Sequence, residues 1–221
     1  EFEEPLREAT SDLSWLLTRG YGSNSSIKIV GDRYGLAARQ RVAVSRSACS
    51  DQQLRRRSQC HVDTSELAGR DLWIDGFNLL TTIEAALSGG LILLARDGCC
   101  RDMASMHGNY RRVQETLPAV RLIGEFAANC NVSRCHWILD SPVSNSGRLK
   151  TILRETAEGH GWDWEVQLVH DADALLIQCE ETVASADSHV LDRSARWFNL
   201  ARVIIETSIH PKWVLRLDCG S

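Results

Sequence analysis

The sequence of 221 residues lacks the features that mark several large classes of protein. It has no apolar run of the roughly 18 residues that a membrane-spanning helix needs, so we expect no membrane segment. Its first residues lack the basic and then apolar region of a secretory signal, so a cytoplasmic location is expected. The eight cysteines form no Cys-x-x-Cys pair, which favours reduced thiols over the alternative of a zinc site.

Internal repeats are also missing, and no Ser-His-Asp or Cys-His arrangement for nucleophilic catalysis is recognisable. The net charge of −4 argues against a protein that coats nucleic acid, but the charge is unevenly distributed. Residues 11–60 hold nine Lys and Arg against three Asp, whereas residues 71–221 hold 14 basic and 20 acidic side chains. This charge distribution is expected of a protein in which one part holds a polyanion and the other part cuts it. The open alternative is that the basic residues form a solvated helix face.

The sequence does contain a recurring pattern, in which a short apolar run ends in aspartate. These runs end at Asp75, Asp97, Asp140, the pair Asp171 and Asp173, and Asp187. Continuous apolar runs of this length are typical of strands that are buried on both faces of a parallel sheet. Helical stretches lie between several of them, so the predicted fold class is α/β, with a central, mostly parallel sheet flanked by helices.

The periodicity divides the chain into two parts. We predict a helical, basic N-terminal domain over residues 1–60, a polar linker over 61–70, and an α/β domain over 71–221. Ser50 is expected to cap a short basic helix in the first domain. Further along, the pattern predicts a loop over 96–110, a helix over 111–130 that Pro118 breaks, a helix over 193–202 and a strand over 203–206.

The aspartates of the α/β domain are expected to meet at one place. Because the carboxyl ends of parallel strands share one edge of the sheet, acids at those ends gather in the crevice there. Carboxylates that are crowded together repel one another unless a cation or a proton lies among them. Hard oxygen ligands suit Mg²⁺ or Mn²⁺, so the sequence predicts a divalent cation site at this edge.

Four short motifs carry a resemblance to a known superfamily. They are IDGFN with Asp75 and Asn78, LD ending at Asp140, ADALLI with Asp173, and SADSHVLD with Asp187. Over residues 71–206 the chain resembles the PIN-like nuclease superfamily, and the NYN ribonucleases and flap endonucleases in particular. Members usually carry a further acid on the helix after the first strand or soon after it, and Glu84 is a candidate for that acid here.

Over its full length the chain also resembles an uncharacterised prokaryotic family, catalogued as domain of unknown function number 434, joined to a PIN-like half. The stretches that carry this second resemblance are RGY, GDRYGL, ARQR, IDGFN, IEAALSG and LDSPVSNSG. It supplies no activity.

The superfamily resemblance implies metal-assisted hydrolysis of phosphodiester bonds. Asp75, Asp140, Asp173 and Asp187 would hold one or two Mg²⁺ or Mn²⁺ ions, and Asn78 would position water or a phosphate. The side chains that we expect to bind the substrate backbone are Arg96, Arg101, Arg111, Arg148, Ser144, Ser146, Arg55, Arg56 and Arg57. For the two serines, a helix N-cap is the open alternative to a phosphate-binding loop.

Three functions remain open at this stage. The leading hypothesis is a Mg²⁺- or Mn²⁺-dependent nuclease that acts on RNA, with a basic N-terminal domain that binds the same substrate. The first alternative is a non-catalytic regulator that binds nucleic acid or nucleotides, because the set of acids is incomplete. The second is a metal-dependent phosphohydrolase for a small metabolite. The choice between RNA and DNA, the mode of cleavage and the presence of a homo-oligomer stay open.

Overall fold

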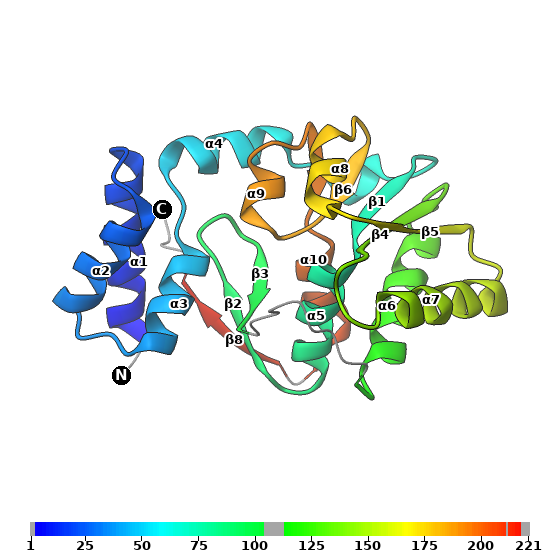
Figure 1. Ribbon diagram of the computed structural model, residues 1–221, viewed down its shortest axis with the longest axis horizontal. Coiled ribbons are helices and arrows are strands. Elements are labelled where there is room, and N and C mark those ends of the chain that lie inside the picture. The colour runs from blue at the N-terminus through cyan, green and yellow to red at the C-terminus, as the bar shows by residue number, and fades with distance from the viewer. Residues whose placement is uncertain (1–2, 104–112, 211, 218–221) are drawn as a thin grey trace.

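The computed structural model describes residues 3–103, 113–210 and 212–217, which form two sheets surrounded by helices (Figure 1). The central sheet has five strands, β1 (Leu72–Asp75), β4 (Cys135–Asp140), β5 (Trp164–Val169), β6 (Thr182–Ala184) and β7 (Arg196–Phe198). The second sheet has three strands, β2 (Leu91–Leu94), β3 (Cys100–Asp102) and β8 (Trp213–Arg216).

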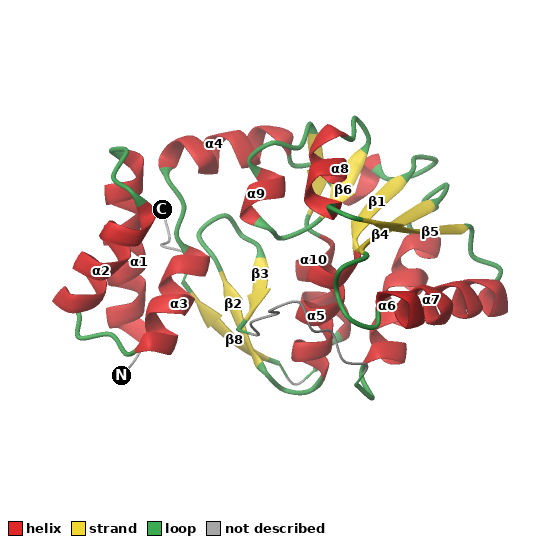
Figure 2. Cartoon of the chain, in the orientation of Figure 1, coloured by secondary structure: helices red, strands yellow, loops and turns green. Residues whose placement is uncertain are grey.

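The helices surround both sheets (Figure 2). In chain order they are α1 (Glu3–Thr18), α2 (Ser23–Arg33), α3 (Ala38–Ser47), α4 (Asp51–Cys60), the short 3-10 helix η1 (Thr64–Glu66), α5 (Gly76–Leu87), α6 (Thr116–Asn129), α7 (Ser146–His160), α8 (Ala172–Gln178), α9 (Ser188–Leu191) and α10 (Leu200–Ser208). None of these helices, over the ranges just given, combines the length and the apolar character needed to cross a bilayer.

The central sheet is parallel throughout and has the strand order β5-β4-β1-β6-β7. Its strands alternate between two cores, as the period of two along a strand requires. Trp137 and Leu139 of β4 pack into the large core with α5, α6, α7 and α10, whereas Ile138 packs with α8 on the other face. The prediction of an α/β fold with a central parallel sheet, flanking helices and an N-terminal helical region is confirmed.

Strand β2 does not belong to the central sheet, which corrects the prediction that its apolar run adds a strand there. It pairs antiparallel with β3 and parallel with β8. Ile92 and Leu94 pack into the large core beneath α5, while Leu93 faces the N-terminal helices. A continuous apolar run predicts burial on both faces, and β2 is buried on both faces, but such a run does not specify the sheet.

The N-terminal helices pack on the second sheet. Leu13 of α1 and Val44 of α3 are buried in one core with Leu93 and Leu217, which come from distant parts of the chain. Ser50 caps helix α4 as predicted, since its Oγ accepts a hydrogen bond of 3.2 Å from the backbone N–H of Gln53. The division into residues 1–60, 61–70 and 71–221 stays a prediction.

Three local predictions differ from the structure. The expected loop over 96–110 contains β3, and Pro118 lies in the first turn of α6, where proline does not break a helix. Residues 196–198 form strand β7 rather than a helix, and α10 covers the residues expected as a strand over 203–206. The β-branched residues Ile204 and Ile205 favour a strand, which explains the wrong prediction. The segment is a helix because these residues pack on α5 and α6 at helical spacing with Leu200.

A buried network of charges joins α4 to the turn between β2 and β3. The guanidinium of Arg57 contacts the carboxylate of Asp97, and Arg101 binds the same carboxylate at 2.6 Å and 2.9 Å. Arg57 also donates to Asp192 Oδ1 at 2.7 Å. The side chain of Asp97 is only 1% exposed, and burial raises its pKa, yet Arg101 and Arg57 outweigh this and hold the pKa well below its usual range.

We expect Asp97→Asn to lower the free energy of unfolding by ~3–5 kcal/mol, because it leaves two buried guanidinium groups without a full counter-charge. The measurement is urea denaturation followed by circular dichroism. Asp163→Asn is the matched control, since the ion pair of Asp163 with Arg134 is exposed and its loss should cost far less. Equal losses in the two variants would contradict a special role for the buried network.

Candidate functional site

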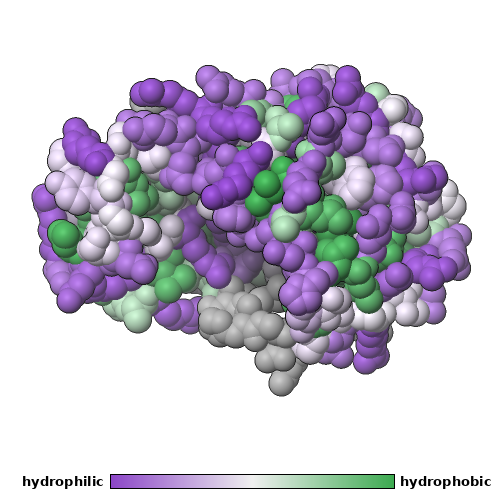
Figure 3. All heavy atoms as spheres, turned by 45° about the horizontal axis from the view of Figure 1, so that its top comes forward, coloured by the Kyte–Doolittle hydropathy of each residue, from purple (hydrophilic) through white to green (hydrophobic). Residues whose placement is uncertain are grey.

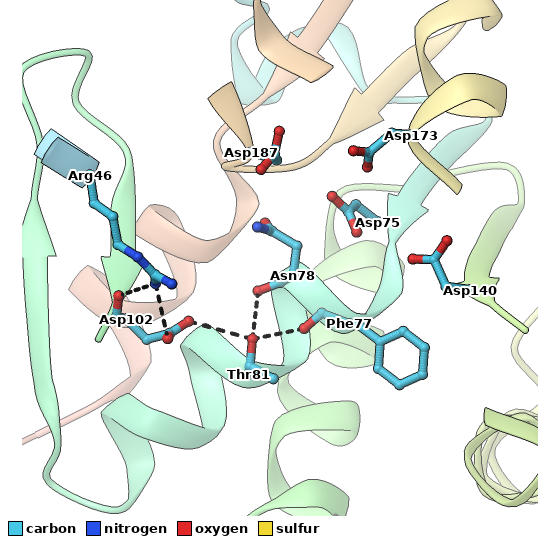
Figure 4. Close-up of a pocket in the computed structure, with 9 residues that line it drawn as sticks. All are labelled: Arg46, Asp75, Phe77, Asn78, Thr81, Asp102, Asp140, Asp173 and Asp187. Atoms are coloured by element: carbon cyan, nitrogen blue, oxygen red, sulfur yellow. Dashed lines mark hydrogen bonds and ion pairs between the residues drawn. The ribbon is translucent and has the colours of Figure 1, made fainter. Parts of the chain in front are cut away.

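Four of the predicted aspartates line one cavity at the carboxyl edge of the central sheet. Asp75 ends β1, Asp140 ends β4, Asp173 lies in the first turn of α8 after β5, and Asp187 follows β6. Their carboxylates surround a common space of about 250 Å³, which Asn78 also lines (Figure 4). The parallel sheet therefore brings together side chains that are up to 112 residues apart in the sequence, from Asp75 to Asp187.

The cavity lies where the order of the strands reverses. The chain continues from β1 outward to β4 and β5, and then returns to place β6 on the other side of β1. Connections on the two sides diverge at such a point and leave a crevice, which is where open α/β sheets bind ligands. Asp75 and Asp187 lie on either side of this crevice, and Ser185 joins them, since its Oγ donates to Asp75 Oδ2 at 2.7 Å and accepts from the N–H of Asp187 at 3.0 Å.

Gly76 explains how β1 can pass directly into α5 beside the cavity. A Cβ atom at this position would overlap the side chain of Leu139 and approach the carbonyl oxygen of Ile138 to 3.1 Å. Glycine therefore allows α5 to start against β4, and the helix begins at the residue after Asp75. This places Asp75 at the positive end of the helix dipole and Asn78 within its first turn.

Crowding of the acids changes their protonation. Burial raises the pKa of Asp75 to about 7, and the charges of Asp173 and Asp187 add to this, although the hydrogen bond from Ser185 opposes it. Burial also raises the pKa of Asp173, helped by Asp187 and Asp140. The four side chains are thus close enough to repel one another, and Asp75 holds its proton up to neutral pH.

Several hydrogen bonds fix the acids in place. Asp140 Oδ1 accepts from the N–H of Ala172 at 2.8 Å, and Asp187 Oδ1 caps the short helix α9 by accepting from the N–H of His189 at 2.7 Å. The cap explains the presence of Asp187 in part. Asp75 occupies the N-cap position of α5, and its Oδ2 accepts the hydrogen bond from Ser185. Its carboxylate is buried among the other acids of the cavity, which capping of α5 does not by itself explain.

A fifth acid, Asp102 of β3, also lines the cavity, although the sequence placed it outside the ligand set. Its Oδ2 accepts from the hydroxyls of Thr82 at 3.1 Å and Thr81 at 3.4 Å, both on α5. The signal that could have found it is the Asp97-Gly98 pair between two apolar stretches, which is typical of a tight hairpin. Gly98 has a φ of 78°, and the hairpin carries Asp102 to the cavity.

Glu84, the candidate for a further acid, does not line the cavity. It is buried on α5, away from the cavity, and its Oε1 accepts a hydrogen bond of 2.6 Å from the hydroxyl of Thr116.

The oxygen atoms of these side chains suit a hard divalent cation, but the carboxylates lie too far apart to hold one as they stand. Carboxylate and amide oxygens are the ligands that Mg²⁺ and Mn²⁺ prefer. Burial and the charges of Asp173 and Asp187 raise the pKa of Asp75, and a bound cation would offset both. Within the described ranges, however, no three His, Cys, Asp or Glu side chains are grouped closely enough to hold an ion. A bound cation would therefore have to draw the carboxylates inward.

Two of the predicted substrate-binding arginines have other partners. Arg96 donates to the carbonyl of Cys49 and to Asp51 Oδ1, both at 2.6 Å, and so ties the β2–β3 turn to the start of α4. Arg101 is buried, and its guanidinium donates to Asp97, to the carbonyl of Ala186 at 2.8 Å and to that of Arg46 at 3.2 Å. Neither side chain is arranged to bind a nucleic acid backbone directly.

The three consecutive arginines of α4 do not form one basic surface. Arg55 is exposed, whereas Arg56 donates to the carbonyl of Ser194 at 3.0 Å. Arg57 is 2% exposed and belongs to the buried charge network, which corrects its prediction as a substrate-binding residue. An α-helix turns by about 100° per residue, so adjacent side chains cannot share one face.

The remaining predicted residues lie around the start of α7. Ser144 and Arg148 are exposed, and Ser146 is buried as the first residue of the helix, with its Oγ donating to the carbonyl of Ser141 at 3.3 Å. The position before the helix is occupied by Asn145 with a φ of 65°, so neither serine occupies the N-cap. Arg111 lies outside the described residues.

The raised pKa of Asp75 predicts how stability depends on pH when no metal is present. Its folded-state pKa of about 7 exceeds the unfolded value, so its ionisation destabilises the fold as pH rises from about 4 to about 7. We expect Asp75→Asn to raise the melting temperature in EDTA more at about pH 8 than at about pH 5. Asp163→Asn, which removes an exposed acid, should show no such gain; an equal effect of Asp75→Asn at both pH values would contradict the assignment.

Comparison with known proteins places the chain in a family. Residues 5–59 match the family described as Protein of unknown function (DUF434), and residues 64–203 match the one described as Domain of unknown function (DUF5616). The resemblance to an uncharacterised family is thus confirmed. The uncharacterized protein MJ0935 of Methanocaldococcus jannaschii is 28% identical over 186 residues, which cover 84% of this chain and 88% of that protein. No solved structure matches the chain. Because the second of the two family matches spans more than half of the residues, the chain belongs to the family described as Domain of unknown function (DUF5616).

Proposed function

We propose that this protein is a PIN-like nuclease that hydrolyses phosphodiester bonds in RNA with the help of Mg²⁺ or Mn²⁺. The observation that carries the proposal is the cavity at the reversal point of the sheet, where Asp75, Asp140, Asp173 and Asp187 meet. A pocket this acidic binds a cation before it binds a polyanion. A phosphodiester is a substrate whose reaction such cations assist.

The roles of the chain's own residues follow from their contacts. When bound, a divalent cation would supply a Lewis acid that lowers the pKa of water and offsets charge on the leaving oxygen. Asp75, Asp140, Asp173 and Asp187 would hold it. Ser185 keeps Asp75 oriented through its 2.7 Å hydrogen bond, and Asp75 must release its proton, which its pKa of about 7 allows at neutral pH.

Asn78 has a separate role in the proposed reaction. Its Oδ1 accepts from the backbone N–H of Ala186 at 2.9 Å, which fixes the amide plane next to Asp187. The Nδ2 group of the same amide is then the donor that faces a substrate phosphate or a water. This arrangement agrees with the position of Asn78 in the IDGFN motif.

One observation favours a non-catalytic binding protein instead. Among the residues that the structure describes, no three potential ligands are grouped closely enough for a metal ion. A regulator that binds nucleic acid and has lost full metal chemistry would show the same spacing. The two functions differ in whether metal binding depends on the aspartates, and in whether RNA is cut.

The first test is cleavage of a fluorescent RNA oligonucleotide in Mn²⁺ or Mg²⁺. We expect Asp75→Asn to lower the cleavage rate by at least about 100-fold, since an amide is a weaker cation ligand than a carboxylate. Loss of the fold would not explain this result, because removal of the buried charge should stabilise the metal-free protein. Asp163→Asn is the control, since Asp163 precedes β5 at the opposite end of the sheet.

Calorimetric titration with Mn²⁺ distinguishes the two functions. Binding by the wild type and its loss in Asp187→Asn would support a site built from these acids. Cleavage of RNA by Asp75→Asn at the rate of the wild type would contradict the proposed active site. Failure of the wild type both to bind the ion and to cut RNA would favour the regulator.

A further inference from the structure

A second cavity lies directly beside the carboxylate cavity. It has a volume of about 280 Å³ and shares Arg46, Asn78, Asp102 and Asp187 with the first. The polar side chains that distinguish it are three hydroxyls and one guanidinium, namely those of Ser45, Thr82, Ser188 and Arg101. The space-filling view shows a hollow lined by hydrophilic side chains between the N-terminal helices and the rest of the molecule (Figure 3).

The two cavities differ in charge. Five carboxylates and one guanidinium, that of Arg46, line the first cavity, whereas two carboxylates and two guanidiniums line the second. A polynucleotide that reaches the carboxylates carries further phosphates on either side of the bond that is cut. The second cavity is the adjoining place where hydroxyl donors lie beside the guanidinium of Arg46 and where carboxylates are fewer.

Arg46 is held in place between the two cavities. It belongs to α3, and its Nη1 donates to the backbone carbonyl of Asp102 at 2.7 Å. From behind, Arg101 donates to the carbonyl of Arg46 at 3.2 Å, and Asp97 anchors Arg101 in turn. The guanidinium is thus positioned by a strand and a helix, and its side chain remains 34% exposed.

Asp102 contacts Arg46 on one side and α5 on the other. Asp102 Oδ1 forms an ion pair with Arg46 Nη1 at 3.6 Å. Asp102 Oδ2 accepts from the hydroxyls of Thr81 and Thr82. Figure 4 shows Arg46 reaching across from α3 toward Asp102 and Asn78, on the side of the cavity opposite to Asp140.

We infer that Arg46 binds the backbone phosphate next to the one that is cut, within the second cavity. The inference rests on the proposed function, since it takes RNA as the ligand. It assigns the contribution of the N-terminal helices to a single residue of α3 rather than to the arginines of α4. A phosphate there would lie next to the guanidinium of Arg46 and accept hydrogen bonds from the adjacent hydroxyls.

The test measures binding of a fluorescent single-stranded RNA by anisotropy, in Ca²⁺, with the length of the RNA checked on a gel afterwards. We expect Arg46→Gln to weaken binding by about tenfold or more, as for the loss of a charge-assisted contact. It should also lower the slope of log affinity against log salt by about one. Arg39→Gln is the matched control, because it removes the same charge from the exposed first turns of α3.

The outcomes separate this inference from the proposed function. Equal weakening by Arg39→Gln and Arg46→Gln, no weakening by Arg46→Gln, or no binding of RNA by the wild type would each overturn it. If Arg46→Gln does not fold, Arg46→Lys keeps the charge but loses the planar fork, and should bind RNA more weakly than Arg39→Gln. If Arg46→Gln alone weakens RNA binding and Asp75→Asn still cleaves RNA at the full rate, the proposed active site is refuted. Arg46 would then remain a residue that binds RNA.

Discussion

The buried contact of Asp97 with Arg57 and Arg101 is the interaction on which the rest of the structure depends. Removing three charges from water is costly, and only close mutual pairing offsets that cost. The pairing requires α4 to lie against the hairpin of β2 and β3, with Arg101 also bonded to the carbonyl of Ala186. One network therefore fixes the N-terminal helices, the second sheet and the segment that carries Asp187 relative to one another.

The candidate site depends on that arrangement from two directions. The parallel sheet supplies Asp75 and Asp140 from its strand ends, and the reversal between β1 and β6 leaves the crevice that they line. The charge network positions Asp187 and Arg46, since Arg101 donates to the carbonyl of Ala186, next to Asp187, and to the carbonyl of Arg46. The N-terminal helices are thus built into the wall of the site, and the shared core of Leu13 and Leu93 keeps them there.

Prediction from the sequence worked where local pattern and burial agree. Short apolar runs that end in aspartate predicted β1, β4, β5 and β6 of the central sheet and the positions of Asp75, Asp140 and Asp187, because a strand buried on both faces is continuously apolar. Strand β7 was expected as part of a helix. Prediction failed for Arg57, since a basic run looks the same whether its members are solvated or paired in the interior. It failed for α10 as well, where packing against α5 and α6 overrides the strand preference of Ile204 and Ile205.

The sequence by itself determined the α/β class, the parallel sheet and the gathering of acids at one of its edges, since these follow from short-range periodicity and from the geometry shared by all parallel strands. Only the tertiary structure decided that β2 joins a second sheet, that Asp102 reaches the cavity and that Arg46 faces the acids. Those outcomes rest on contacts between different elements, such as Asp102 with Thr82, Arg46 with Asp102, and β2 with β8. Local patterns carry no record of such contacts, because the partner is chosen by packing and by the pairing of buried charge.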